Sequence, residues 1–338
     1  MNLKETLSIL CEPVGVAGCE FPASNAAREL LLKYAPNAEV DKFGNVVGTI
    51  MFDENLPVLL LDAHIDEIGM IVNFIDENGF LKVSGAGGID TRGLPAQMVT
   101  VWGKKPVKGV VCALPPHVKK DEGKALNADE ISIDCGFTKE SAQELISLGD
   151  VVTIDAEFAE LQGGKVTSRA LDDRAGVAAI LYALDLIKTR KVNFNLAILF
   201  SAQEELGCRG AVISAFNIAP NLSISVDVSY GNYPGSPENK TWKLGAGVMV
   251  GNSPVLDKTL YSKLVNIAKN KNIPCQVEVM GGKTGTTADV ISIARTGVKC
   301  GLLSIPLRNM HTAAELVQLS DIEATGKLIS EFIMGEIV

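Results

Sequence analysis

Three continuous runs of apolar residues are the clearest feature of the hydrophobic pattern along the chain. They cover Leu56–Asp62, Asn195–Ser201 and Leu222–Val228. An apolar run without polar alternation is typical of a strand that is buried on both faces, as in a sheet between two helical layers. We therefore expect these runs to form the central strands of an α/β domain.

Helical periodicity surrounds these strands. Between residues 174 and 189, apolar side chains recur three and four positions apart, at 177, 180, 181, 184 and 187. A second amphipathic stretch, Ser320–Met334, opens with Ser320 and Glu323 in the spacing of a capping box. Near the N-terminus the pattern predicts a helix, a glycine-rich turn, a second helix over Ala23–Tyr34, and then a strand.

Residues 67–164 follow a different pattern. Glycines punctuate short alternating segments such as Met98–Trp102 and Val107–Cys112, and one short helix is predicted over Lys139–Ser147. This stretch is typical of a small β-rich module. We expect it to be inserted into a discontinuous main domain made of residues 1–66 and 165–338.

Composition narrows the class of partner. The 338 residues include 31 Lys and Arg against 40 Asp and Glu, which gives a net charge of −9. Such a surface repels phosphate and argues against nucleic acid as a partner. Mean hydropathy is +0.22, which is apolar for a monomer, so we expect some apolar surface to be buried between subunits of a homo-oligomer.

Cysteine usage and the N-terminus bear on the compartment. The seven cysteines form no Cys-x-x-Cys pair, which favours reduced, mostly buried thiols over a disulfide framework. The first residues lack the apolar core of a signal peptide, and no uncharged apolar stretch reaches the roughly 18 residues that a membrane span needs. A cytoplasmic location is the prediction.

The first candidate site is His64 and Asp66, just past the run that ends at Asp62. Ligands of open α/β sheets gather at the carboxyl ends of the strands. In an extended chain His64 and Asp66 face the same side, which suits a metal-binding histidine whose second nitrogen is fixed by a carboxylate. A purely structural hydrogen bond between them remains an alternative.

Two pairs of adjacent acids form the next candidates. Asp172 and Asp173 precede the long helix; one aspartate can cap a helix, but two exceed what a cap requires, and a carboxylate there could bridge two cations. Glu204 and Glu205 follow the strand that ends at Ser201. Neighbouring side chains of an extended chain face opposite ways, so one can bind metal while the other acts as a general base.

Asp227 and His311 complete the set, because each lies in or after a buried-type strand. A carboxylate such as Asp227 at such a place is costly unless it is paired, hydrogen-bonded or bound to a metal. The combined inventory fits two metal ions with a bridging carboxylate. Three other features are not expected to belong to the site. Cys208 is predicted to lie in the core, and His117 to be a loop or interface residue. The segment Gly281–Thr287 lacks the spacing of a phosphate loop.

Five segments resemble the signature segments of the glutamyl or tetrahedral aminopeptidases, metallopeptidase family M42, whose members are also called deblocking aminopeptidases or, misleadingly, cellulases or endoglucanases. They are AHIDEIG, ALDDRAG, SAQEELGCRGA, SVDVS and SIPLRNMHT. The resemblance covers nearly the whole chain. It implies a zinc-exopeptidase-like αβα sandwich with a mixed central sheet, and it makes residues 67–164 a small barrel- or PDZ-like dimerisation and oligomerisation module.

The same resemblance implies an aminopeptidase with two divalent metal ions per subunit, zinc or cobalt, with manganese as the alternative. His64 and Asp227 would bind one metal, Glu205 and His311 the other, and Asp172 would bridge them. Members act on the N-termini of peptides and form homo-oligomers, commonly dodecamers built from dimers.

Glu204 resembles the family's general base, which takes a proton from a metal-bridging water, and Asp66 resembles the carboxylate that orients a metal-binding histidine. In similar proteins the peptide bond equivalent to Asp172–Asp173 is cis. One departure concerns the active-site rim: family members often have an aspartate where this chain has Thr287.

Two other classes of protein are compatible with parts of this pattern. A glycoside hydrolase would also use two carboxylates, but it would not need the histidines and would keep its activity in a chelator. A non-catalytic assembly protein would have no use for a base beside a metal ligand.

Overall fold

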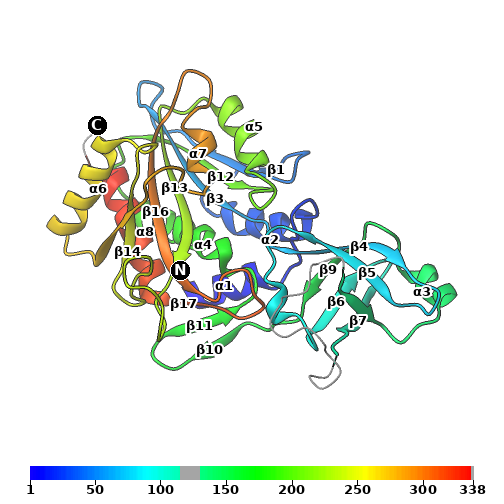
Figure 1. Cartoon of the computed structure of the whole chain (residues 1–338). Helices are drawn as coiled ribbons and strands as arrows, with labels where there is room; N and C mark the ends of the chain where they lie inside the picture. The colour runs from blue at the N-terminus through cyan, green and yellow to red at the C-terminus, as the bar shows by residue number, and fades with distance from the viewer. Residues whose placement is uncertain (115–129, 336–338) are drawn as a thin grey trace.

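The computed structural model describes residues 1–114 and 130–335. A sheet covered by helices forms one part of the molecule, and a closed barrel projects from one side of it (Figure 1). His117 lies outside the described residues.

The centre of the large sheet consists of parallel strands, in the order β12 (Asn195–Ser201), β3 (Val58–His64), β13 (Leu222–Tyr230) and β16 (Lys299–Arg308). These four are buried along almost their whole length. Antiparallel strands flank them, so the sheet is mixed. The remaining strands are β2 (Val46–Ile50) and β1 (Glu39–Val40) on one side, β17 (Glu315–Gln318), β11 (Lys165–Ser168) and β10 (Ala159–Leu161) on the other, and β14 (Val248–Asn252) with β15 (Cys275–Val279) attached to β16.

Helices cover both faces of this sheet. One layer is built around α4 (Leu171–Ile187), which packs on the central strands and against α1 and α8; the opposite face carries α5 and α7. The bounds of the other helices are α1 (Leu3–Cys11), α2 (Phe21–Leu31), α5 (Arg209–Ile218), α6 (Lys258–Asn270), α7 (Ala288–Ile291) and α8 (Leu319–Met334). The result is an αβα sandwich.

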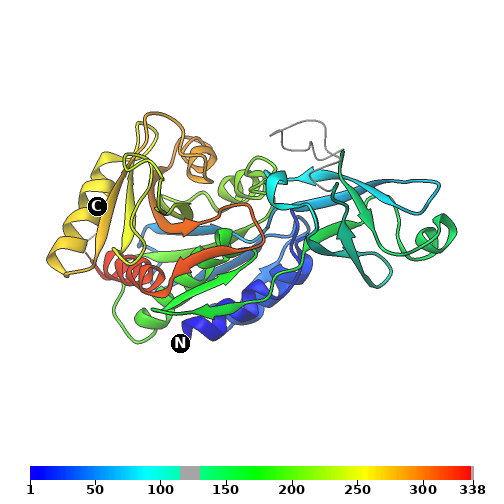
Figure 2. The ribbon, with the colours of Figure 1, turned by 60° about the horizontal axis from the view of Figure 1, so that its bottom comes forward.

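The barrel has its own apolar core, separate from the core of the sandwich. Its strands close in the order β4-β5-β8-β7-β6-β9, and Figure 2 shows the barrel standing apart from the sandwich. The elements are β4 (Gly69–Ile75), β5 (Leu81–Ala86), the 3₁₀ turn η1 (Thr91–Gly93), β6 (Met98–Trp102), β7 (Pro106–Val111), β8 (Ser132–Asp134), α3 (Lys139–Leu145) and β9 (Val151–Ile154).

The expected fold class is confirmed, including the mixed central sheet and the β-rich barrel. The three apolar runs are β3, β12 and β13. The boundary at residue 164 stays a prediction, although β10 pairs with β11 and so extends the large sheet rather than the barrel.

The predicted capping box is wrong. Helix α8 begins at Leu319, and its N-cap residue Gln318 makes no side-chain capping bond. Asp321 instead accepts hydrogen bonds from the backbone N–H groups of Gly245 and Gly247, at 2.7 and 2.8 Å. The acidic side chain at the start of this helix thus binds the backbone of a distant loop instead of capping its own helix.

Each of the seven cysteines lies in the described part of the chain and is a free thiol. The expectation that most are buried is wrong: Cys11 and Cys300 are buried, Cys19 is exposed, and the others are half-buried. Within residues 1–114 and 130–335, the helices are too short or too polar to cross a membrane.

Candidate metal centre and active site

The predicted site residues meet at the carboxyl ends of the central strands. His64 is the last residue of β3, Asp227 lies near the end of β13, and Asp172 lies in the first turn of α4. The two glutamates follow β12, and His311 follows β16. Together they line a cavity of about 290 Å³, whose walls are His64, Asp172, Glu204, Glu205, Asp227, Val228, Ser229, Tyr230, Thr284, Gly285, Thr286, Met310 and His311.

Asp172 stands between the two histidines. Its Oδ1 lies 3.0 Å from His64 Nε2, and its Oδ2 lies 3.4 Å from His311 Nε2. Each carboxylate oxygen therefore faces a different imidazole, which is the arrangement of a bridging ligand.

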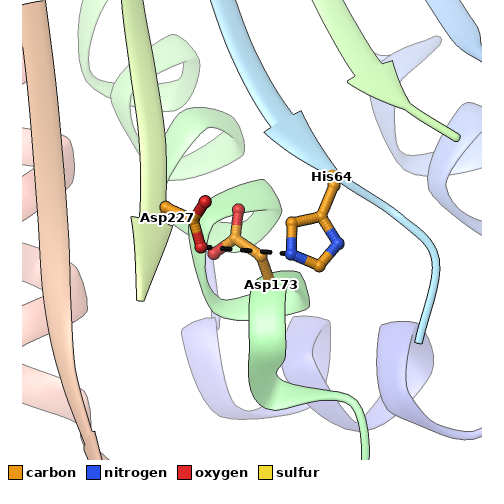
Figure 3. Close-up of side chains that lie close together, drawn as sticks. All are labelled: His64, Asp173 and Asp227. Atoms are coloured by element: carbon orange, nitrogen blue, oxygen red, sulfur yellow. Dashed lines mark ion pairs between the residues drawn. The ribbon is translucent and has the colours of Figure 1, made fainter. Parts of the chain in front are cut away.

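Two groups of potential ligands lie on either side of Asp172. In the first, His64 Nε2 is 3.9 Å from Asp227 Oδ1, and Asp173 lies beside both; Figure 3 shows these side chains coming from β3, β13 and the start of α4. In the second, Asp172 and Glu205 face His311, whose Nε2 is 3.1 Å from Glu205 Oε1.

The charges of the site are unbalanced. Burial opposes protonation of His64, but hydrogen bonds to Asp172 and Asp66 outweigh it and hold its pKa well above the usual value. Hydrogen bonds to Asp172 and Glu205 raise the pKa of His311 to about 11. Burial also raises the pKa of the Asp227 carboxyl well above its ordinary value. The neighbouring carboxylates thus favour the positively charged form of both imidazoles.

A buried oxygen without a partner also indicates that the site can accept a cation. Asp173 is fully buried, and among the described residues its Oδ2 has no hydrogen-bond partner. Carboxylate oxygens and imidazole nitrogens are the ligands of zinc, cobalt and manganese sites in proteins. The residues present therefore fit divalent cations.

Glu204 also lines the cavity. It is largely buried, and this burial raises its pKa to about 7, although His64 acts in the opposite direction. A carboxyl group with such a pKa can both accept and return a proton near neutral pH. Cys208, expected in the core, is only half-buried, and its thiol lies 3.3 Å from Glu204 Oε1.

Asp66 holds the loop that carries the two glutamates. Its carboxylate accepts hydrogen bonds from the backbone N–H groups of Glu204 and Glu205, at 3.0 and 3.1 Å. The same carboxylate is 3.6 Å from His64 Nδ1, and the Asp66 carbonyl oxygen is 3.2 Å from that nitrogen. Asp66 thus orients both the histidine and the acidic pair.

Glu315 is a buried site residue that the sequence reasoning missed. Its two oxygens accept the backbone N–H groups of Asp172 and His311, each at 3.0 Å. The available signal was weak: Glu315 alternates with Val317 on the buried face of a short strand. Glu315 thus fixes the backbone of Asp172 and His311, as Asp66 fixes the backbone of Glu204 and Glu205.

Arg174 fastens the start of α4. It is fully buried and donates hydrogen bonds to the carbonyl oxygens of Leu10, Pro13 and Ile65 and to the carboxylate of Glu67. These contacts join α1, the loop after β3 and the first turn of α4, which contains Asp172.

Position 287 is not at the rim of the cavity. Thr287 is buried, and its hydroxyl donates a hydrogen bond to the buried carboxylate of Asp62. The rim is formed by Thr284, Gly285 and Thr286. The expected cis peptide bond between Asp172 and Asp173 is present.

Known proteins match this fold and sequence over most of their length. The family model of the M42 glutamyl aminopeptidases matches residues 44–328. The lysyl aminopeptidase of Pyrococcus furiosus is 33% identical over 331 residues, which are 96% of this chain and 94% of that protein. An aminopeptidase from the archaeon Desulfurococcus kamchatkensis is 32% identical with a TM-score of 0.92, covering 98% of this chain and 94% of its own.

A third match concerns the TET1 peptidase of Pyrococcus horikoshii, which is described as able to assemble into a tetrahedron or a large octahedral shell. It is 29% identical with a TM-score of 0.84, covering 99% of this chain and all of its own. The fold and these relatives define the class of the protein as a peptidase. The chain belongs to the M42 glutamyl aminopeptidase family, and it is an aminopeptidase.

Proposed function

We propose that this aminopeptidase works with two divalent metal ions per chain. His64 and Asp227 would hold one ion, Glu205 and His311 would hold the other, and Asp172 would contribute to both. The observation that carries the proposal is the placement of the two Asp172 oxygens, each facing a different histidine. Zinc or cobalt suits this mixture of imidazole and carboxylate, and manganese is the alternative.

When bound, such ions act as Lewis acids on the scissile carbonyl and make water a stronger nucleophile. The chain itself supplies the proton transfers. Glu204 takes a proton from the attacking water and returns it to the leaving amine, a role that its pKa of about 7 supports. The Asp66 carboxylate keeps Glu204 in place by accepting a hydrogen bond from the Glu204 backbone N–H.

The substrates we propose are short peptides with a free N-terminus. The cavity is small, about 290 Å³. A cavity of this size accommodates a terminal residue rather than the middle of a folded chain.

The decisive variant is Glu204→Gln. We expect it to keep two metal ions per chain by elemental analysis and to lose about 10²- to 10⁴-fold in kcat on an aminoacyl chromogenic substrate. The matched control is His64→Ala, which should lose metal as well as activity. Turnover by Glu204→Gln near the unmodified rate would overturn the role of Glu204.

Removing metal with a chelator distinguishes a metal-dependent aminopeptidase from a hydrolase that works without metal. It should abolish aminopeptidase turnover, and readdition of zinc, cobalt or manganese should restore it and rank the ions. Peptide hydrolysis that survives complete metal removal would contradict the dinuclear proposal.

We also propose that the chain forms a homo-oligomer, with a dodecamer built from dimers as the expected size and the module of residues 67–164 making the contacts. The support is the assembly described for the Pyrococcus horikoshii relative. Native mass spectrometry of the full chain tests it, and a monomer at micromolar concentration would contradict it.

A further inference from the structure

His311 is held in an unusual conformation. Its φ is +62°, in the left-handed region that non-glycine residues rarely adopt. Besides Glu315, two groups of the segment between β5 and β6 hold it in place. The backbone N–H of Asp90 donates to the His311 carbonyl oxygen at 3.3 Å, and the Gly88 carbonyl oxygen lies 2.8 Å from His311 Nδ1.

The second contact decides which ring nitrogen is available. A carbonyl oxygen can only accept, so His311 Nδ1 must carry the hydrogen. The other nitrogen, Nε2, is then the one that faces Asp172 and Glu205, 3.4 and 3.1 Å away, and it can bind a metal ion once its own proton has left. Fixing the tautomer in this way is how neighbouring groups tune metal-binding histidines.

The same segment touches the other ligand of this group. A Cβ at Gly87 would lie 2.8 Å from Ile68 and 3.1 Å from the Glu205 side chain, and one at Gly88 would lie 2.9 Å from His311 Nδ1. Gly88 needs no positive φ, and among the described residues the His311 ring is what its Cβ would meet. The chain passes so close that a single methyl group would displace the imidazole.

We propose that residues 87–90, which belong to the barrel-side segment between β5 and β6, are a positioning element for the metal ion held by Glu205 and His311. The Gly88 carbonyl fixes the tautomer and orientation of His311, and Gly87 and Gly88 leave the room that both ligands need. This inference rests on the proposed dinuclear site. It makes the inserted barrel a part of one metal site.

The test compares Gly88→Ala with Gly93→Ala in the full chain. Gly93 lies in the same segment, and in the described structure a Cβ there would meet nothing within 4 Å, so it is the matched control. Each chain is stripped of metal with a chelator and titrated with Zn²⁺ by calorimetry, with bound zinc counted by elemental analysis. The unmodified chain and Gly93→Ala should each bind two ions.

Gly88→Ala should bind one Zn²⁺ with unchanged affinity and the second about 10- to 100-fold more weakly, the usual effect of losing a group that orients a ligand. Two ions at unchanged affinity, or both sites weakened equally, would overturn the inference while leaving the dinuclear site intact. Fewer than two ions on the unmodified chain would overturn the dinuclear proposal itself, and this inference with it.

A double-mutant cycle shows whether the substitution acts through the imidazole. In the chelator, Gly88→Ala should lower the unfolding midpoint of the chain that keeps His311 and leave that of His311→Ala unchanged. If Gly88→Ala folds only when combined with His311→Ala, the clash again runs through the ring. An equal loss in both backgrounds, or failure of both to fold, would mean that Gly88 acts through the backbone and would overturn the proposal.

Discussion

Two buried carboxylates organise this site by binding backbone rather than metal. Asp66 accepts the N–H groups of Glu204 and Glu205, and Glu315 accepts those of Asp172 and His311. Each therefore fixes two site residues at once. Residues of this kind are sensitive points, because a buried N–H that loses its acceptor costs about 1–3 kcal/mol.

Glu315→Gln tests this at the scale of one residue. The amide keeps the size of the side chain but turns a donor toward one of the two N–H groups. We expect a loss of about 1–3 kcal/mol in the free energy of unfolding, measured by denaturant titration, with weaker zinc binding. Glu323→Gln, at an exposed ion pair with Lys327, is the control and should change little. Equal stability of the two variants would contradict the role of Glu315.

A second prediction concerns the hydrogen bond between Thr287 and Asp62. Its hydroxyl donates to Asp62, whose other oxygen, Oδ1, is buried without a partner in the described structure. Thr287→Val should therefore destabilise the fold by about 1–3 kcal/mol, and Thr287→Ser should retain most of the stability. Thermal and denaturant unfolding measure this, and a neutral Thr287→Val would contradict it.

The pH dependence of stability should include a contribution from Glu20. Burial raises its pKa from 4.5 to about 7, so the folded chain holds this proton more tightly than the unfolded chain. The stability from this group is complete below the unfolded pKa and is lost as pH rises through the folded pKa. Glu20→Gln should remove a decline of about 3 kcal/mol between about pH 4.5 and 7. Parallel stability–pH curves for the two proteins would contradict this.

At the scale of elements, the hydrogen bonds of Arg174 connect α4 to α1 and to the loop after β3. Arg174→Met would leave three carbonyl oxygens and part of the Glu67 charge without their donor. Breaking a buried pair on one side typically costs about 3–5 kcal/mol. The exposed Arg190, just beyond α4, provides the control Arg190→Met. Denaturant unfolding should separate the two by several kcal/mol.

Elements whose apolar pattern is continuous were predictable from sequence. The runs that became β3, β12 and β13 are buried on both faces, and the ligands could be found because each follows such a run. The failures have a different cause. Glu315 reaches Asp172 across 143 residues, Gly88 reaches His311 across 223, and Asp321 is used by a distant loop. Local pattern carries no information on such contacts.

At the scale of the whole molecule, metal loading should be coupled to protons. Hydrogen bonds to neighbouring carboxylates raise the pKa of His311 to about 11 and, against the effect of burial, hold the pKa of His64 above its usual value, so the metal-free chain favours the protonated imidazoles. Binding requires the neutral rings. Calorimetric titration with Zn²⁺ in buffers of different ionisation enthalpy should show proton release, and affinity should increase with pH. A buffer-independent enthalpy would contradict the prediction.

The contact between His64 and Asp172 also joins the two ends of the chain segment that contains the inserted barrel. His64 and Asp172 are 108 residues apart, and the barrel strands lie between them. Joining these positions closes a loop in the polymer sense, and the entropy of closure grows only with the logarithm of loop length. Doubling the loop adds about 0.6 kcal/mol. An insertion of different size is therefore thermodynamically tolerable here, so long as its ends and residues 87–90 keep their geometry.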